Sequence, residues 1–253
     1  MTPSGFARGI RGRLGKGLAS ALAGLCCGCG LVSDTPSPLC SHCREALPRV
    51  QHPCGRCGVA RIRDADLDSA EGICRRCRAA APAFDCCTGA FAYGRAAAQL
   101  ISSYKFQGRM DIGAALSADL AAGIHSSDGV LVAVPLHWVR LRERGFDQAG
   151  EIARRLARET GMENLSHLIE RARFTAPQTE MPSARARRRN LSGAFQLRKH
   201  ASFAAYPRVL IIDDVVTTGS TVSEVAKLLR AAGARRIEVR CLARADLERP
   251  KES

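Results

Sequence analysis

The first third of this 253-residue chain carries four C-x-x-C pairs, a pattern typical of metal-binding ribbons. The pairs use eight of the 12 cysteines: Cys26/Cys29, Cys40/Cys43, Cys54/Cys57 and Cys74/Cys77. Two thiolates on one tight turn can occupy two corners of a tetrahedron, which suits zinc. Cys54-x2-Cys57-x16-Cys74-x2-Cys77 has the spacing of a four-cysteine zinc site, and the first two pairs have a tighter but workable spacing.

We therefore expect a double zinc ribbon over residues 26–80 with two structural zinc ions. Four thiolates close the coordination shell, so these ions would hold the fold rather than catalyse. The alternatives are one zinc ion, pairing of cysteines across the two sets, and redox thiols or disulfides. A secreted disulfide framework is disfavoured, because the chain continues into a long cysteine-poor region.

Residues 1–25 are interpreted as a basic tail and a short helix. The apolar stretch 18–25 is at the lower limit for the core of a signal peptide. Leu25 precedes Cys26, where cleavage of a lipoprotein would need a small residue. No apolar run reaches the ~18 residues of a membrane-spanning helix, which excludes an integral membrane protein. We expect a cytoplasmic protein.

From residue 88 to residue 246 the sequence alternates between helix-like and strand-like stretches, beyond a boundary near residues 78–90. The expected helices are residues 94–105, 109–122, 149–157 and 222–229, two of them marked by an amphipathic stripe. The expected strands are residues 131–134, 209–212 and 237–242, which are apolar almost throughout. Strand, helix and strand with apolar strands predict an α/β fold with a parallel sheet.

The segment VLIIDDVVTTGST, residues 209–221, carries the chemistry. A buried strand delivers Asp213 and Asp214 at its carboxyl end, where open α/β sheets bind ligands. A hydroxyl-rich turn with Gly219 follows and leads into a helix, whose N-terminus suits a phosphate. Thr221-x-x-Glu224 predicts a capping box at the start of that helix. The two acids suit ribose hydroxyls or Mg2+ rather than the phosphate.

This combination resembles the diphosphoribose (PRPP) signature of type I phosphoribosyltransferases. Further motifs resemble the ComF family: Val134-Pro135-Leu136, Arg142-x-Arg144-Gly145-Phe146-Asp147-Gln148, Tyr104-Lys105-Phe106, and Arg171-x-Arg173 followed by Gln178, Arg185 and Asn190. The cysteine pairs match the double zinc ribbon of that family. The resemblance covers residues 25–245 in order as well as content. Asp147 departs from it, because the family usually has Asn there.

The resemblance implies a type I phosphoribosyltransferase-like sheet flanked by helices. It also implies binding of PRPP with Mg2+ and transfer of phosphoribosyl to an unknown acceptor, with pyrophosphate leaving. Asp213 and Asp214 would hold the ribose hydroxyls and organise Mg2+. The PRPP-binding residues would also include Val215, Thr217, Thr218, Gly219, Ser220, Thr221, Pro135 and Leu136. Lys105, Arg142 and Arg144 would neutralise the pyrophosphate. A basic flap would close over it with Arg171, Arg173, Gln178, Arg185, Arg188 and Asn190.

The formal net charge is +14, from 38 Lys and Arg against 24 Asp and Glu. This charge points to polyanions, either nucleic acid or small molecules rich in phosphate. The alternative function is therefore a non-catalytic accessory protein of the same fold that serves natural transformation. Its candidate partners are single-stranded DNA or a DNA-uptake helicase. The chain has only one Trp, and we expect Trp138 to pack beside its loop rather than stack on bases.

Overall fold

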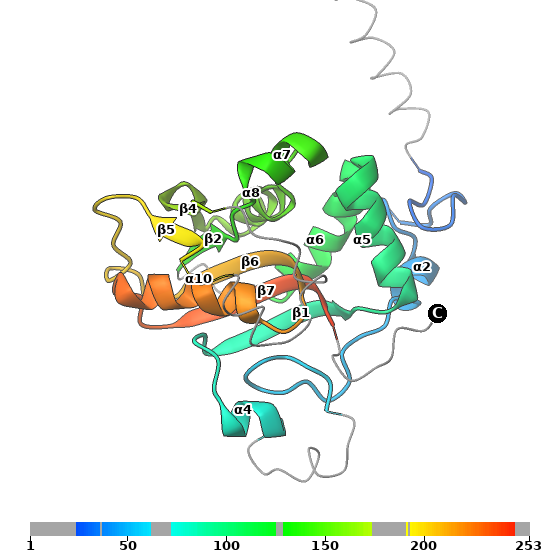
Figure 1. Cartoon of the computed structure of the whole chain (residues 1–253). Coiled ribbons are helices and arrows are strands. Elements are labelled where there is room, and N and C mark those ends of the chain that lie inside the picture. Colours follow the sequence, from blue (N-terminus) through cyan, green and yellow to red (C-terminus); the bar gives the residue numbers. More distant parts are fainter. Residues whose placement is uncertain are drawn as a thin grey trace, which may run out of the picture. The chain divides into compact units, whose positions relative to one another are not determined.

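The computed structural model describes residues 24–35, 37–61, 72–124, 129–173, 191 and 193–245 (Figure 1). The chain divides into two compact units, Met1–Ala46 and Leu47–Ser253. The first unit holds the first cysteine set and the short helix α2 (Ser41–Glu45). The second unit holds both the second cysteine set and the sheet. The three-part division drawn from the sequence stays a prediction, and most of its basic tail lies outside the described residues.

Five parallel strands form the central sheet in the order β1-β7-β6-β2-β3. They are β1 (Cys86–Ala92), β2 (Val130–Ala133), β3 (Glu163–Asn164), β6 (Val209–Val216) and β7 (Ile237–Arg244). The register pairs Ala133 with Ile212 and Asp213 with Cys241, so β6 lies between β2 and β7. The predicted parallel sheet is confirmed. β1 was not predicted, because its sequence CCTGAFA lacks a run of large apolar residues.

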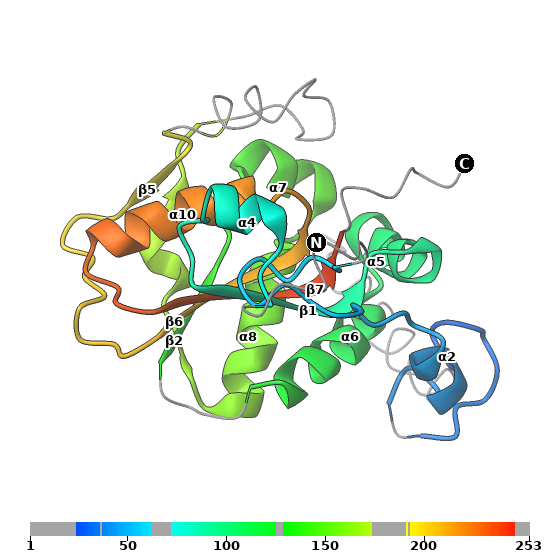
Figure 2. The ribbon, with the colours of Figure 1, turned by 90° about the horizontal axis from the view of Figure 1, so that it is seen from below.

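Helices cover both faces of this sheet (Figures 1 and 2). On one face α6 packs on β1 and β7, and α8 packs on β2, β3 and β6, while α10 packs on the opposite face. The four predicted helices are confirmed as α5 (Arg95–Gln107), α6 (Met110–Ala122), α8 (Gln148–Thr160) and α10 (Ser220–Ala231). Two short helices were not predicted, α4 (Arg75–Ala79) and α7 (Trp138–Arg144). In Figure 2, α4 lies on the same side of the sheet as α10.

Close packing between α5 and α6 holds Lys105 in place. Gly113 of α6 lies under the ring of Tyr104, where a Cβ atom would come within 2.5 Å of that ring. The Tyr104 hydroxyl donates a hydrogen bond to the Gln148 carbonyl oxygen at 3.2 Å, and the side chain is fully buried. Because Tyr104, the residue before Lys105, contacts Gly113 of α6 and bonds to Gln148 of α8, the end of α5 is held near the start of α8.

A small antiparallel pair stands apart from the main sheet. It joins β4 (Ile169–Arg171), which follows a 3-10 turn at Ser166–Leu168, to β5 (Phe195–Leu197). Most of the chain between these strands lies outside the described residues, including Gln178, Arg185, Arg188 and Asn190 of the predicted flap. Within the described residues, no helix combines the length and apolar character that crossing a membrane requires.

Candidate functional site

The two acids of the central strand face opposite sides of the sheet. β6 runs to Val216, so Asp213 and Asp214 lie inside the strand and not beyond its end. Successive strand residues alternate in direction. Asp213 accordingly lines a pocket at the start of α10, whereas Asp214 Oδ2 lies 2.9 Å from Lys105 Nζ. Lys105, which we expect at the leaving pyrophosphate, forms an ion pair with Asp214 in the structure.

Negative charge is crowded at this position. Burial and the charge of Asp214 together raise the pKa of Asp213 to about 8, against the opposing effect of Lys105. Burial also raises the pKa of Asp147, which precedes α8 and is influenced by Asp214. A cluster of carboxylates like this one favours the binding of a cation or of hydrogen-bond donors, because either would relieve the repulsion between the negative charges.

The segment that joins β6 to α10 wraps a small pocket that is open to solvent. Its lining comprises Asp213, Val215, Val216, Thr217, Thr218, Gly219, Ser220, Thr221 and Val222. All the predicted PRPP-binding residues of this segment except Asp214 are therefore brought together. Three of its backbone amides, those of Thr217, Thr218 and Gly219, donate to no acceptor in the described part of the chain. Free amides at a helix N-terminus can bind an anion.

The capping box was predicted at the wrong residue, because Thr221 is not the N-cap of the helix. α10 begins at Ser220, after an N-cap at Gly219 whose φ is 79°, so Thr221 already lies inside the helix. A glycine suits that left-handed conformation, which costs other residues free energy. The side-chain hydrogen bonds at the start of α10 come from the Thr218 hydroxyl and not from Thr221. The Thr218 hydroxyl accepts from the Ser220 amide at 3.3 Å and lies 2.8 Å from the Ser220 hydroxyl.

The predicted basic residues of α7 do not line this pocket. Pro135 and Leu136 are half-buried in the turn that leads from β2 into α7. The Arg142 guanidinium lies 5.1 Å from the Trp138 ring centroid, and Arg144 lies 5.3 Å from the Phe106 ring centroid.

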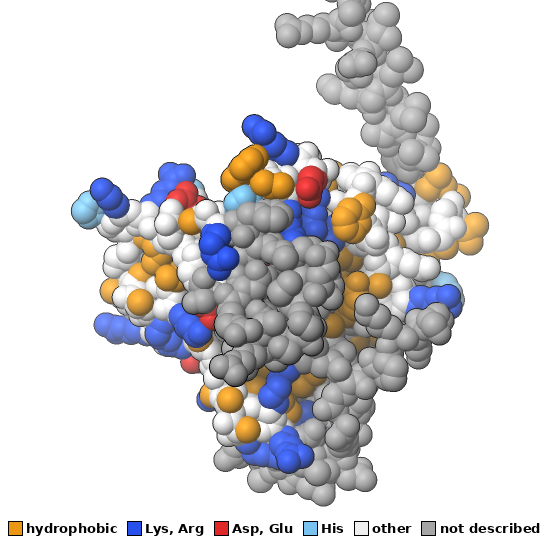
Figure 3. All heavy atoms as spheres, in the orientation of Figure 1, with side chains coloured by type: hydrophobic (Ala, Val, Ile, Leu, Met, Phe, Trp, Pro, Cys, Tyr) orange, Lys and Arg blue, Asp and Glu red, His pale blue; other side chains and the backbone are white. Residues whose placement is uncertain are grey.

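The expected packing of Trp138 beside its loop is wrong. α7 buries none of its residues, and the Trp138 side chain is 58% exposed. Phe106 is 70% exposed. Figure 3 shows hydrophobic and basic side chains next to one another over α7.

Two arginines of the predicted flap, Arg171 and Arg173, lie among the described residues. Arg171 ends β4 with its guanidinium 5.3 Å from the Phe195 ring centroid. Burial and the charge of Arg140 lower the pKa of Arg171 to about 10, and Asp213 acts in the opposite direction. The base of the predicted flap therefore lies within electrostatic reach of Asp213. Arg173 lies just beyond β4.

The second cysteine set forms a buried tetrad: Cys54, Cys57, Cys74 and Cys77. Its four sulfur atoms lie within 4.8 Å of one another, and the Cys57 and Cys74 sulfurs are 3.7 Å apart. A zinc tetrahedron with bonds of about 2.3 Å has edges of about 3.8 Å. Hydrogen bonding with Cys57 lowers the pKa of Cys54 to about 4, while burial raises the pKa of Cys77 to about 12. A dication would stabilise all four as thiolates, so the residues fit zinc.

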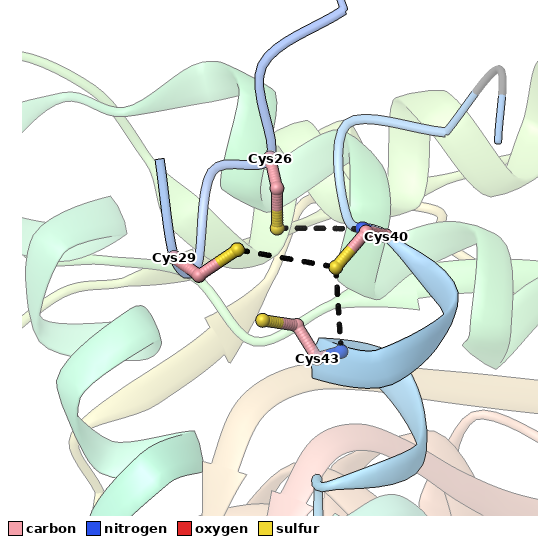
Figure 4. Close-up of side chains that lie close together, drawn as sticks. All are labelled: Cys26, Cys29, Cys40 and Cys43. Atoms are coloured by element: carbon pink, nitrogen blue, oxygen red, sulfur yellow. Dashed lines mark hydrogen bonds between the residues drawn. The ribbon is translucent and has the colours of Figure 1, made fainter. Parts of the chain in front are cut away.

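The first set forms a second tetrad, shown in Figure 4: Cys26, Cys29, Cys40 and Cys43. The Cys29 and Cys40 sulfurs are 4.0 Å apart. The Cys26 sulfur accepts the Cys40 amide at 3.4 Å, and the Cys40 sulfur accepts the Cys43 amide at 3.4 Å. Such hydrogen bonds orient metal ligands. All described cysteines are free thiols, and each tetrad uses only its own set, so the alternatives of disulfides and of pairing across the sets are not found among them.

Comparison with known proteins gives two kinds of match. The family model of the phosphoribosyl transferase domain matches residues 112–253. Competence protein F of Haemophilus influenzae is 32% identical over 215 residues, which cover 82% of this chain and 90% of that protein. DNA utilization protein YhgH of Escherichia coli (strain K12) is 33% identical over 230 residues, covering 87% and 90%. Competence protein ComFC of Streptococcus pneumoniae is 26% identical over 220 residues, covering 85% and 91%.

Zinc content tests the two tetrads separately. Protein purified without chelator should carry about two zinc ions per chain. Cys54→Ser should leave about one ion and lower the thermal stability, because metal binding there contributes to folding. Cys86→Ser is the matched control, since Cys86 lies in β1 outside both tetrads. An unchanged zinc content in Cys54→Ser would contradict the assignment.

Asp213→Asn should stabilise the ligand-free protein at high pH. The pKa of Asp213 is about 8 in the folded protein and about 3.9 in an unfolded chain. The folded state therefore binds the proton more tightly, and stability falls as the pH rises between these values. Thermal melts should show the variant above wild type at pH above about 8, with the gain fading toward pH of about 4.

Asp111→Asn is the control for that pH series. The hydrogen bond from Arg109 lowers the pKa of Asp111, so its ionised form stabilises the folded state. Asp111→Asn should therefore not melt at a higher temperature than wild type at high pH. Equal melting temperatures of Asp213→Asn and wild type throughout the series would show that Asp213 is not under electrostatic strain.

Proposed function

Because the chain belongs to the ComF family and has its phosphoribosyl transferase domain, we propose that it binds PRPP with Mg2+ and transfers the phosphoribosyl group. Pyrophosphate is the leaving group, and the acceptor is a nucleophile that this site does not identify. One observation carries the proposal. A carboxylate, four hydroxyls and three amides that donate to no acceptor among the described residues surround one pocket where the central strand meets a helix N-terminus.

The 5′-phosphate fits the amide end of this pocket. The amides of Thr217, Thr218 and Gly219 offer hydrogen bonds there, and the start of α10 adds a favourable dipole. The ribose hydroxyls fit Asp213, which would accept hydrogen bonds from them. This pairing replaces the repulsion between Asp213 and Asp214 with charge-assisted hydrogen bonds. Binding of the ribose hydroxyls would thus offset part of the electrostatic repulsion at Asp213.

Among the described residues, only the cysteine tetrads bring together three or more metal-ligating side chains. Mg2+ does not need such a cage, because it is usually held by one or two carboxylates together with substrate phosphates and water. The acids of β6 fit that role. Bound Mg2+ would neutralise the charge that grows on pyrophosphate as the C1′–O bond breaks. An acceptor lone pair forms the new bond to C1′ as the C1′–O bond breaks, and the ion pair with Lys105 holds Asp214 in its orientation.

Titration calorimetry with PRPP and Mg2+ tests the proposal. Wild type should bind, and Asp213→Asn combined with Asp214→Asn should weaken binding at least tenfold, since hydrogen bonds to charged groups are worth about 1.5–3 kcal/mol each. Gly219→Val should also weaken it, because a β-branched residue disfavours the φ of 79° at that position. Pyrophosphate release with a panel of bases then tests turnover.

Asp111→Asn is the matched carboxylate control, since Asp111 lies on α6 and pairs with Arg109. It should bind PRPP as wild type does. A folded wild type, loaded with zinc, that gives no heat and no thermal shift with PRPP would refute the proposed site.

A second candidate function rests on the exposed face of α7 and the end of α5. Trp138 with Arg142, and Phe106 with Arg144, each combine an exposed ring with a guanidinium. Bases of single-stranded nucleic acid stack on such rings, and the net charge of +14 attracts phosphates. Two of the relatives are named for competence and one for DNA utilization. We infer a cytoplasmic accessory role in DNA uptake, with single-stranded DNA or a DNA-uptake helicase as partner.

Single-stranded DNA binding should weaken steeply as salt rises, because counterions are released on binding. Trp138→Ala should weaken binding by about 1–3 kcal/mol if a base stacks there, without changing the affinity for PRPP. Tyr93→Ala is the control, since Tyr93 is an exposed aromatic away from α7. Fluorescence anisotropy measures both. Binding that does not depend on salt, or a Trp138→Ala variant that binds as wild type does, would exclude this surface.

A further inference from the structure

The largest fully buried side chains include a charged one, Arg244, at the end of β7. It is 2% exposed. Gly89 of β1 leaves space for it, because a Cβ atom there would lie 2.8 Å from Arg244 Cβ. Burying a guanidinium costs free energy unless its N–H groups are bonded.

Arg244 donates to two parts of the chain that are far apart in sequence. Its Nε bonds to the carbonyl oxygen of Cys57 at 2.7 Å, within the buried tetrad. Its Nη1 bonds to the carbonyl oxygens of Val216 at 2.9 Å and of Thr217, which begin the PRPP-binding segment. The same Nη1 also donates to the carbonyl oxygen of Ala245 at 2.7 Å, so the guanidinium bonds to four carbonyl oxygens in all. One buried cation thus joins the tetrad to the pocket.

The other half of the tetrad makes a parallel link. Arg76 lies in α4 between Cys74 and Cys77, and its Nη2 donates to the Thr218 carbonyl oxygen at 3.5 Å. Gly58, which follows Cys57, sits against β1, where a Cβ atom would lie 2.3 Å from the Cys87 carbonyl oxygen. Each C-x-x-C pair of this tetrad is therefore linked through one arginine to the same stretch, residues 216–218: the first through Arg244 of β7 and the second through its own Arg76.

These contacts determine which way the amides point. In a trans peptide group the C=O and the following N–H point in opposite directions. Holding the carbonyls of Val216, Thr217 and Thr218 on the side of the tetrad directs the next three amides away from it. Those amides, of Thr217, Thr218 and Gly219, are the ones that donate to no acceptor among the described residues. A loop fixed in this way loses less entropy when it binds a phosphate.

We propose that Arg244, supported by Arg76, is a positioning residue that couples zinc in the second tetrad to PRPP in the pocket. Zinc holds the Cys57 carbonyl and α4 in place, the two arginines hold the loop carbonyls, and the loop amides face the ligand. Because such coupling is reciprocal in binding free energy, PRPP should raise the affinity of this tetrad for zinc, so that a chelator removes the ion less readily. The inference rests on the proposed PRPP site.

Two arginine variants and one control test the coupling by calorimetry. Arg244→Lys keeps the charge but cannot reach all four carbonyls, so PRPP should bind about tenfold more weakly, since each hydrogen bond from a charged group is worth about that much. Arg76→Ala should have a smaller effect in the same direction. Arg78→Ala is the matched control. Arg78 is exposed on the same helix, and its guanidinium donates to the Ile73 carbonyl oxygen instead of the loop.

Zinc release to a colorimetric chelator is the second measurement, and it does not depend on PRPP. Arg244→Lys and Arg76→Ala should release one of the two zinc ions faster than Arg78→Ala and wild type. Adding PRPP with Mg2+ should slow that release in wild type more than in Arg244→Lys. Zinc content and thermal melts identify any variant that fails to fold, in which case Arg76→Ala carries the test.

The outcomes separate this inference from the proposed function. Equal PRPP affinity and equal zinc release in wild type, Arg244→Lys and Arg76→Ala would overturn the coupling while leaving the PRPP site intact. A wild type that binds no PRPP would refute the proposed function. The release rates would then decide by themselves whether the arginines link the tetrad to the loop, and equal rates would overturn that link.

Discussion

The position of β6 between the shorter strand β2 and the equally long β7 determines where this fold can present polar groups. Val209 to Ile212 are completely buried, and they pair with β2 on one side and β7 on the other. β2 ends at Ala133, opposite Ile212, whereas β7 continues to Arg244. From Asp213 onward the strand keeps only one neighbour, and space opens on the side that β2 leaves. The acids begin at the residue where that partner ends.

The apolar strands and the striped helices could be read from the sequence because their periodicity reflects burial. The end of β6 could not, because Asp has a low strand propensity and only the pairing with β7 carries the strand through Asp213 and Asp214. β1 escaped prediction because it is built of small residues. α7 was not predicted because none of its residues is buried, so its sequence has no apolar stripe.

The residues of the candidate site could be predicted from the sequence, but the contacts between them could not. The acids and the TTGST segment could be identified because their residue types match one chemistry. The Lys105–Asp214 ion pair depends on the packing of α5 against α8, and no local spacing reveals it. The same holds for Arg244, which looks like an ordinary strand-end arginine until the fold buries it. The start of α10 was misplaced by the left-handed backbone at Gly219.

The two cysteine tetrads look like copies in the sequence, yet they belong to different compact units. The second packs through Gly58 and Arg244 on the sheet itself. A new second ribbon acquired by recombination would therefore have to bring its own contacts to β1 and β7. Evolution should treat the second ribbon as part of the domain, although its motif looks like a separate module.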